Sequence, residues 1–263
     1  ASDLGTRFGE LCDIPTGPDQ LKNMRDLPVE KIIDVGKIGF SSSFFVDGKS
    51  ILSPVMKSFE DGLNHKVPTI IGTNADEGTA LYWGSPLADV PPPINSVEKY
   101  RLVIADKFGE KSEEILSIYP ASDKEEMIRS SKSLLGDSLF GAPSYFAAKS
   151  MAKRGESIYF YHFNQKPSGK AGELLGAFHA YEIGYVFGVG GLGPIENQYL
   201  SDTMLSYWTN FATNGNPNSD SLPAWETMKS DKNTWHVLGP EIGEKEIDRM
   251  EIYSLLEDLE FVT

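Results

Sequence analysis

Residues 67–79 read VPTIIGTNADEGT, an apolar and β-branched run that leads directly into an acidic pair and a glycine. The run over 67–74 predicts a buried strand of an α/β sheet. In open α/β sheets, functional groups lie just beyond the carboxyl ends of the strands. Glu77 is therefore a candidate for a fixed carboxylate in a crevice. The pattern also fits a plain turn made by Asp76 and Gly78, with Glu77 in solvent.

Other segments define the surrounding architecture. A second strand is predicted over 157–163 (SIYFYHF) and a short third one over 234–238, whereas the Gly- and Lys-rich residues 164–178 are predicted to form a loop. Apolar periodicity predicts helices over 1–13, 19–35 with a break at Pro28, 96–108, 111–118, 123–134, 143–154, 201–213 with Ser201 as N-cap and Gly215 past its end, and 250–259.

Strands separated by long helical stretches favour an α/β fold with a mainly parallel sheet. Only two or three convincing strands accompany 263 residues. Because so few strands cannot shield a large helical shell, we expect the chain to be part of a larger sheet, with large helical inserts.

His179 lies in GAFHAYEIGYVFG at 176–188, a Gly-rich stretch after the second strand. A histidine there can offer one ring nitrogen to a nucleophile and the other to an orienting acid. A structural loop histidine fits the pattern equally well. Of the remaining histidines, His162 is expected to pack within its strand, His236 to be structural and His65 to be exposed.

Charge and motif content exclude several classes of function. The chain carries 24 Lys and Arg against 38 Asp and Glu, a net charge of −14, which disfavours nucleic acid and anionic membrane surfaces. No apolar run approaches the roughly 18 residues of a membrane span. The sequence has no CxxC or HExxH motif, so no metal site is predicted. A GxGxxG match at 188–193 is followed by Pro194 and does not begin a strand-to-helix turn, so no cofactor is predicted.

Cys12 is the only cysteine, so the chain cannot form an internal disulfide. This favours a reducing compartment and a cytoplasmic location. Secretion stays open as an alternative, because a partner chain could supply a second cysteine.

Several segments, taken together and in order, resemble the carboxylesterase/cholinesterase family of α/β-hydrolases (type-B carboxylesterases). The resemblance covers almost the whole chain, but only the C-terminal half of that family. It implies that residues 1–263 form the C-terminal part of one α/β-hydrolase catalytic domain. The segments are Phe45-Val46-Asp47-Gly48 with Leu52 and Pro54, VPTIIGTNADEGT at 67–79, Asp137 with Phe140 and Pro143, SIYFYHF at 157–163, HAYEIGYVFG at 179–188 and SYWTNFATNGNPN at 206–218.

The resemblance implies a role for each candidate residue. Glu77 corresponds to the acid of a Ser-Glu-His triad, and His179, in the Gly-x-x-His-x-x-Glu pattern from Gly176 to Glu182, corresponds to its base. The nucleophilic serine and the Gly-rich oxyanion loop belong upstream of Ala1, and no GxSxG occurs here. The expected partner is therefore the N-terminal portion of the same protein. The expected reaction is hydrolysis of small-molecule carboxylic esters through an acyl-enzyme, without a cofactor.

The resemblance also implies substrate-binding positions. Phe40 aligns with residues that line the acyl pocket, and Ala80 and Leu81 follow the acid towards the active-site gorge. These positions lack the aromatic density that choline recognition by cation–π contact requires. A general ester hydrolase is therefore favoured over a cholinesterase.

Two further expectations concern the subgroup. Cys12 resembles the first cysteine of a pair in secreted members, but Met24 stands near the position of the second, which favours a bacterial-type or intracellular esterase.

The alternative function is a non-catalytic adhesion or binding module on the same fold. Such members usually lose triad residues, whereas Glu77 and His179 are both present.

Overall fold

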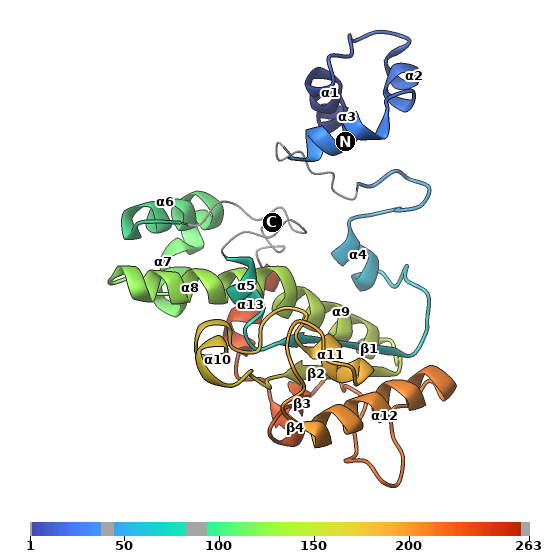
Figure 1. Ribbon diagram of the computed structural model, residues 1–263, viewed down its shortest axis with the longest axis vertical. Coiled ribbons are helices and arrows are strands. Elements are labelled where there is room, and N and C mark those ends of the chain that lie inside the picture. The colour runs from blue at the N-terminus through green and yellow to red at the C-terminus, as the bar shows by residue number, and fades with distance from the viewer. Residues whose placement is uncertain (1, 38–44, 83–93, 259–263) are drawn as a thin grey trace. The chain divides into compact units, whose positions relative to one another are not determined.

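The structure is a computed structural model that describes residues 2–37, 45–82 and 94–258. The chain divides into two units, residues 1–55 and 56–263. The first unit holds three short helices, α1 (Ser2–Leu11), α2 (Gln20–Arg25) and α3 (Val29–Lys37) (Figure 1). Pro28 separates α2 from α3 as predicted, because proline lacks the N–H that would continue the preceding helix.

The second unit is built on a four-stranded sheet of β1 (Thr69–Asn74), β2 (Ile158–Phe163), β3 (Thr234–Leu238) and β4 (Ile242–Glu246), in that spatial order. The pairs β1–β2 and β2–β3 are parallel, and β3–β4 is antiparallel. The predicted α/β class and mainly parallel sheet are confirmed. The strand β4 was not predicted, because its charged sequence, IGEKE, lacks an apolar alternation.

Helices fill the connections between the strands. Between β1 and β2 lie α5 (Glu77–Leu81), α6 (Val97–Phe108), the 3-10 turn η1 (Gly109–Lys111), α7 (Ser112–Ile118), α8 (Lys124–Gly136), the π-helical turn η2 (Asp137–Gly141) and α9 (Ala142–Lys153). Between β2 and β3 lie α10 (Gly169–Leu175), α11 (Glu182–Phe187) and α12 (Gln198–Asn214), while α4 (Val55–Glu60) precedes β1 and α13 (Met250–Asp258) follows β4.

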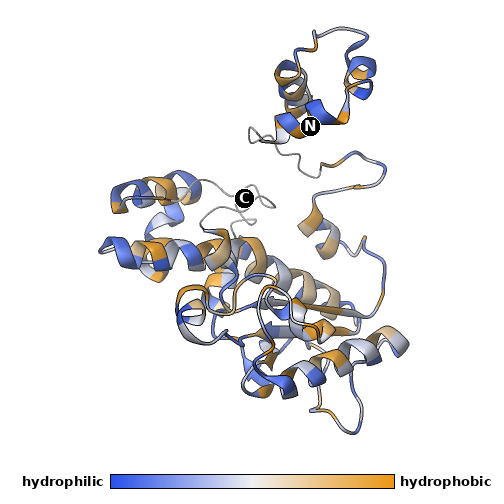
Figure 2. Cartoon of the chain, viewed as in Figure 1, coloured by the Kyte–Doolittle hydropathy of each residue, from blue (hydrophilic) through white to orange (hydrophobic). Residues whose placement is uncertain are grey.

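The sheet separates two hydrophobic clusters, as expected for a layered α/β unit. Alternate residues of β2 point to opposite faces: Ile158 and Phe160 pack with α6–α9 and α13, whereas Tyr159 and Phe163 pack with α11 and α12. Figure 2 shows orange and blue patches along both α6 and α8, the pattern of helices with one buried face. Among the described helices, none combines the length and the hydropathy needed to cross a membrane.

Two local predictions are wrong. Residues 164–178 contain the helix α10, whose glycines disguise it in the sequence. The helix predicted over 201–213 begins earlier, with Asn197 as its N-cap, and Ser201 is a buried residue inside it. Gly215 ends this helix in the left-handed conformation, as the sequence predicts.

Candidate active site

Glu77 begins α5, directly after β1, and its carboxylate is buried. The backbone N–H of Asn74 donates to Glu77 Oε1 at 2.7 Å, and Thr73 Oγ1 donates to the same oxygen at 3.4 Å. Only 7% of Glu77 is exposed. The structure therefore excludes the alternative in which Glu77 is a solvated turn residue.

A short backbone pairing joins the end of β1 to the segment that carries His179. Asp76 and Phe178 form a parallel β-bridge, in which the Asp76 N–H donates to Ala177 O at 3.0 Å. The Ala177 N–H donates in return to the Asp76 carboxylate at 2.8 Å. Gly176 has a φ of 62°, and a Cβ at this position would overlap the Asp76 side chain. The pairing thus requires a glycine at 176.

This pairing brings together two residues that lie 102 positions apart in the sequence. His179 Nδ1 lies 2.6 Å from Glu77 Oε2. The carboxylate favours the tautomer that carries its proton on Nδ1, which leaves Nε2 for another group. The His179 side chain is 41% exposed, and its ring lies 4.6 Å from that of Phe140, centroid to centroid.

The environment of His179 favours its charged form. The hydrogen bond to Glu77 raises the pKa of His179, although partial burial acts in the opposite direction. No hydrogen bond to Nε2 is found among the described residues, and an imidazole held in this way by a buried carboxylate can act as a general base.

Asn74 and Glu182 complete the surroundings of His179. Asn74 Nδ2 donates to Phe178 O at 2.9 Å and to Glu182 Oε2 at 2.5 Å. Burial raises the pKa of the Glu182 carboxyl, and the hydrogen bond from Asn74 partly opposes this rise. Asn74 was predicted only as the last residue of a strand, without a functional role.

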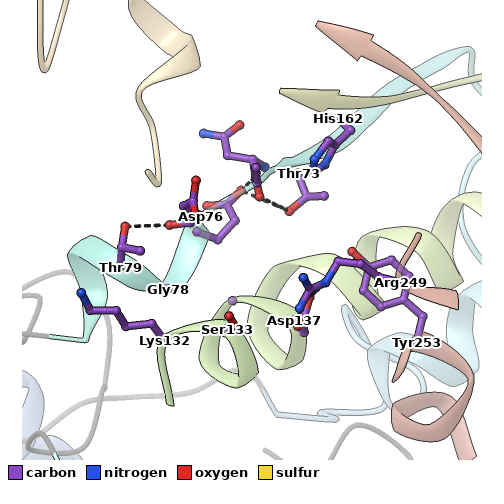
Figure 3. Close-up of a pocket in the computed structure, with 14 residues that line it drawn as sticks. Thr73, Asp76, Gly78, Thr79, Lys132, Ser133, Asp137, His162, Arg249 and Tyr253 are labelled. Atoms are coloured by element: carbon purple, nitrogen blue, oxygen red, sulfur yellow. Dashed lines mark hydrogen bonds and ion pairs between the residues drawn. The ribbon is translucent and has the colours of Figure 1, made fainter. Parts of the chain in front are cut away.

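A cavity of about 30 Å³ lies against Glu77, between the end of β1 and the segment α8–η2 (Figure 3). Its lining includes Thr73 of β1, His162 of β2 and Glu77 at the start of α5. Asp137 of η2 and Arg249, which precedes α13, line the other side. Glu77 thus lines a cavity with polar walls in addition to its contact with His179.

The buried Asp137 forms an ion pair with the partly exposed Arg249 at this cavity. Arg249 Nε donates to Asp137 Oδ1 at 2.7 Å, and Arg249 Nη2 and the Tyr119 hydroxyl both donate to Asp137 Oδ2. Burial raises the pKa of Asp137, and Arg249 and Tyr119 oppose that rise. The family resemblance included Asp137, but nothing in the sequence linked it to Arg249, 112 positions away.

The other histidines lie as the sequence analysis expects. His162 stacks on Trp235 with ring centroids 3.8 Å apart, and His236 stacks on Trp225 at 4.8 Å. Burial lowers the pKa of His162 and of His236 to about 4 each, so both rings are neutral near pH 7. His65 is exposed.

The three predicted substrate-binding positions stay predictions. Leu81 is buried and Ala80 packs at the edge of the second hydrophobic cluster, both within α5. Phe40 lies outside the described residues. In the described part of the chain, no group of three or more His, Cys, Asp or Glu side chains is placed to hold a metal ion.

Comparison with solved structures identifies the class of fold. The structure is similar to that of Aspergillus niger EstA, with a TM-score of 0.73 and 20% sequence identity, over 97% of this chain and 53% of that chain. At this identity the likeness concerns the fold alone.

Sequence comparisons identify the family. The model of the carboxylesterase family matches residues 5–252. Pig liver carboxylesterase is 32% identical over 173 residues, which cover 60% of this chain and 28% of the relative. Dog carboxylesterase 5A is 25% identical over 272 residues, which cover 90% of this chain and 45% of the relative. The chain belongs to the carboxylesterase family, and it spans less than half of the length of these relatives.

Proposed function

We propose that this chain supplies the acid and the base of a Ser-Glu-His triad that hydrolyses carboxylic esters. Membership of the family supports ester hydrolysis in general. The observation that carries the specific roles is the 2.6 Å contact between Glu77 Oε2 and His179 Nδ1. The nucleophilic serine and the oxyanion hole would come from an N-terminal portion of the same protein.

In this mechanism, Nε2 of His179 takes the proton of the serine hydroxyl while the serine oxygen attacks the ester carbonyl carbon. Glu77 stabilises the imidazolium that forms. The imidazolium then protonates the alkoxy leaving group, which departs as an alcohol and leaves an acyl-enzyme. Water repeats the sequence, releases the carboxylic acid and restores the serine.

Substrate selection belongs to the same proposal. Phe40 would form a wall of the acyl pocket, with Ala80 and Leu81 on the approach to the acid. These positions favour a small-molecule ester without a choline group. The lone Cys12 supports a cytoplasmic location for the enzyme.

The test is His179→Ala in the complete polypeptide that contains the serine, assayed on an aryl acetate. We expect kcat to fall by about 10³-fold or more with little change in KM, because the general base is lost. His65→Ala is the matched control, since His65 is exposed, and it should keep its activity. If His179→Ala keeps more than about a tenth of kcat, the assignment of the base is wrong.

The competing function is a non-catalytic adhesion or binding module of the same fold. The buried and fully bonded carboxylate of Glu77 beside a half-exposed His179 favours the enzyme. A complete protein that neither turns over aryl esters nor reacts with a fluorophosphonate would support the module instead.

A further inference from the structure

Asn74 contacts both Glu77 and the segment that carries His179. It precedes Glu77 by three positions in the sequence and is separated from His179 by about a hundred. Only 4% of its surface is exposed. A residue in this place can set the distance between the two groups without contacting any substrate.

All three N–H groups of Asn74 are directed at the site. The backbone N–H holds Glu77 Oε1 at 2.7 Å. One side-chain N–H donates to the carbonyl of Phe178, the residue before His179, and the other donates to Glu182, three residues after it. Asn74 therefore holds the acid through its backbone and the segment around the base, on both sides, through its amide.

The amide oxygen is the remaining polar atom of the Asn74 side chain, and its surroundings show what the amide contributes. Asn74 Oδ1 is buried and has no hydrogen-bond partner among the described residues. A buried acceptor without a partner is destabilising. An apolar side chain of the same size would avoid that cost, so the two amide donors are the property that distinguishes asparagine here.

We propose that Asn74 is a positioning residue for His179: its side-chain amide, bonded to Phe178 O and Glu182, fixes the imidazole against Glu77. This inference rests on the proposed function for its kinetic consequences. The positioning itself is a statement about geometry, and it can be measured without catalysis.

The first test is Asn74→Leu in the complete polypeptide, which removes both amide donors at nearly constant size and keeps the backbone N–H. Displacing a catalytic group by about 1 Å can cost about a hundredfold in rate. We expect kcat to fall by about ten- to a hundredfold with little change in KM. A weaker contact with Glu77 reduces the main interaction that raises the pKa of His179, so this pKa should fall, as read by NMR of the ring.

The second test exchanges donor and acceptor. In Asn74→Asp the side chain can no longer donate to Glu182, and activity should fall at least as far as in Asn74→Leu. Adding Glu182→Gln supplies a donor from the other side, so the double variant Asn74→Asp/Glu182→Gln should recover several-fold in kcat over Asn74→Asp. An additive further loss in the double variant would overturn the proposal.

Asn218→Leu is the matched control for loss of a structural asparagine. The Asn218 side chain bonds both backbone polar groups of Trp225, at 2.7 and 2.9 Å, and none of the residues around His179. The Asn218→Leu variant should lower the melting temperature and leave kcat and the pKa of His179 unchanged. If Asn74→Leu behaves in the same way, Asn74 is structural and the proposal fails.

The outcomes separate this inference from the proposed function. If His179→Ala keeps its activity while Asn74→Leu still shifts the pKa of His179, the triad is wrong and the positioning stands. If His179→Ala is inactive while Asn74→Leu changes neither kcat nor that pKa, the positioning is wrong and the triad stands. Should Asn74→Leu fail to fold, the comparison of Asn74→Asp with its double variant decides.

Discussion

Glu77 and Asp137 are both buried carboxylates that line the same cavity, yet their partners differ in kind. Asp137 is held by the guanidinium of Arg249 and the hydroxyl of Tyr119. Glu77 is held by a backbone N–H and by an imidazole that is partly exposed. An arginine stays charged at every physiological pH, whereas an imidazole gains and loses its proton near neutrality. The first arrangement is suited to hold structure, and the second is suited to move protons.

Of the two carboxylate variants, Glu77→Gln is expected to have the larger effect on activity. The substitution keeps the shape of the side chain but removes the charge that stabilises the imidazolium. In the complete protein kcat should fall by about 10²- to 10³-fold, with a change in stability of less than about 1 kcal/mol. Steady-state kinetics together with urea unfolding would measure both. A loss of stability as large as that expected for Asp137→Asn would show that Glu77, too, is structural.

Asp137→Asn should give the opposite result. The variant leaves Arg249 without a counter-ion, and breaking a buried pair in this way costs about 3 kcal/mol, near the low end of the usual range because the Arg249 side chain is 33% exposed. The free energy of unfolding should fall by that amount, while kcat of the folded protein stays within about twofold of wild type. A hundredfold loss of kcat without unfolding would place Asp137 in the proposed mechanism.

The pH dependence of kcat/KM should also differ between the Glu77 and Asp137 variants, although this effect is smaller than those on kcat and stability. The base must be neutral to act, so kcat/KM falls as the pH drops through the pKa of His179, which Glu77 raises above its ordinary value. Removing the Glu77 charge should move this acid limb to lower pH. Asp137 is not among the groups that shift this pKa, so Asp137→Asn should leave the limb in place. If the acid limb moves by the same amount in both variants, Asp137 also acts on His179 and the distinction between the two carboxylates is wrong.

Both ends of the proposed proton path, Glu77 and His179, were predicted from the sequence, whereas the residue that links them was not. Glu77 follows an apolar strand and His179 follows a Gly-rich turn, but local pattern left both roles open, and the family resemblance gave each its predicted role. Asn74 carries no local signal, because its role depends on where Phe178 and Glu182 arrive in space. The pairing of Asp137 with Arg249 is undetectable for the same reason.

Some elements of the fold were predicted from the sequence and others were not, for similar reasons. Apolar strands and amphipathic helices were predicted close to their observed bounds, since their periodicity follows from burial of one face. The helices α10 and α11 and the strand β4 were missed, because glycines interrupt the first two and charges dominate the third. Contacts with the rest of the unit, more than local propensity, determine these elements.

Gly78 has a consequence for anyone who wishes to redesign the protein. A Cβ there would overlap the carbonyl oxygen of Lys132 on α8, and one at Gly136 would lie 2.9 Å from the Gly78 nitrogen. The two glycines set the spacing between α5 and α8, and Glu77 is the first residue of α5. A mutagenesis library around the proposed site should therefore keep both glycines fixed, because alanine at either position would force α5 and α8 apart and displace the Glu77 carboxylate.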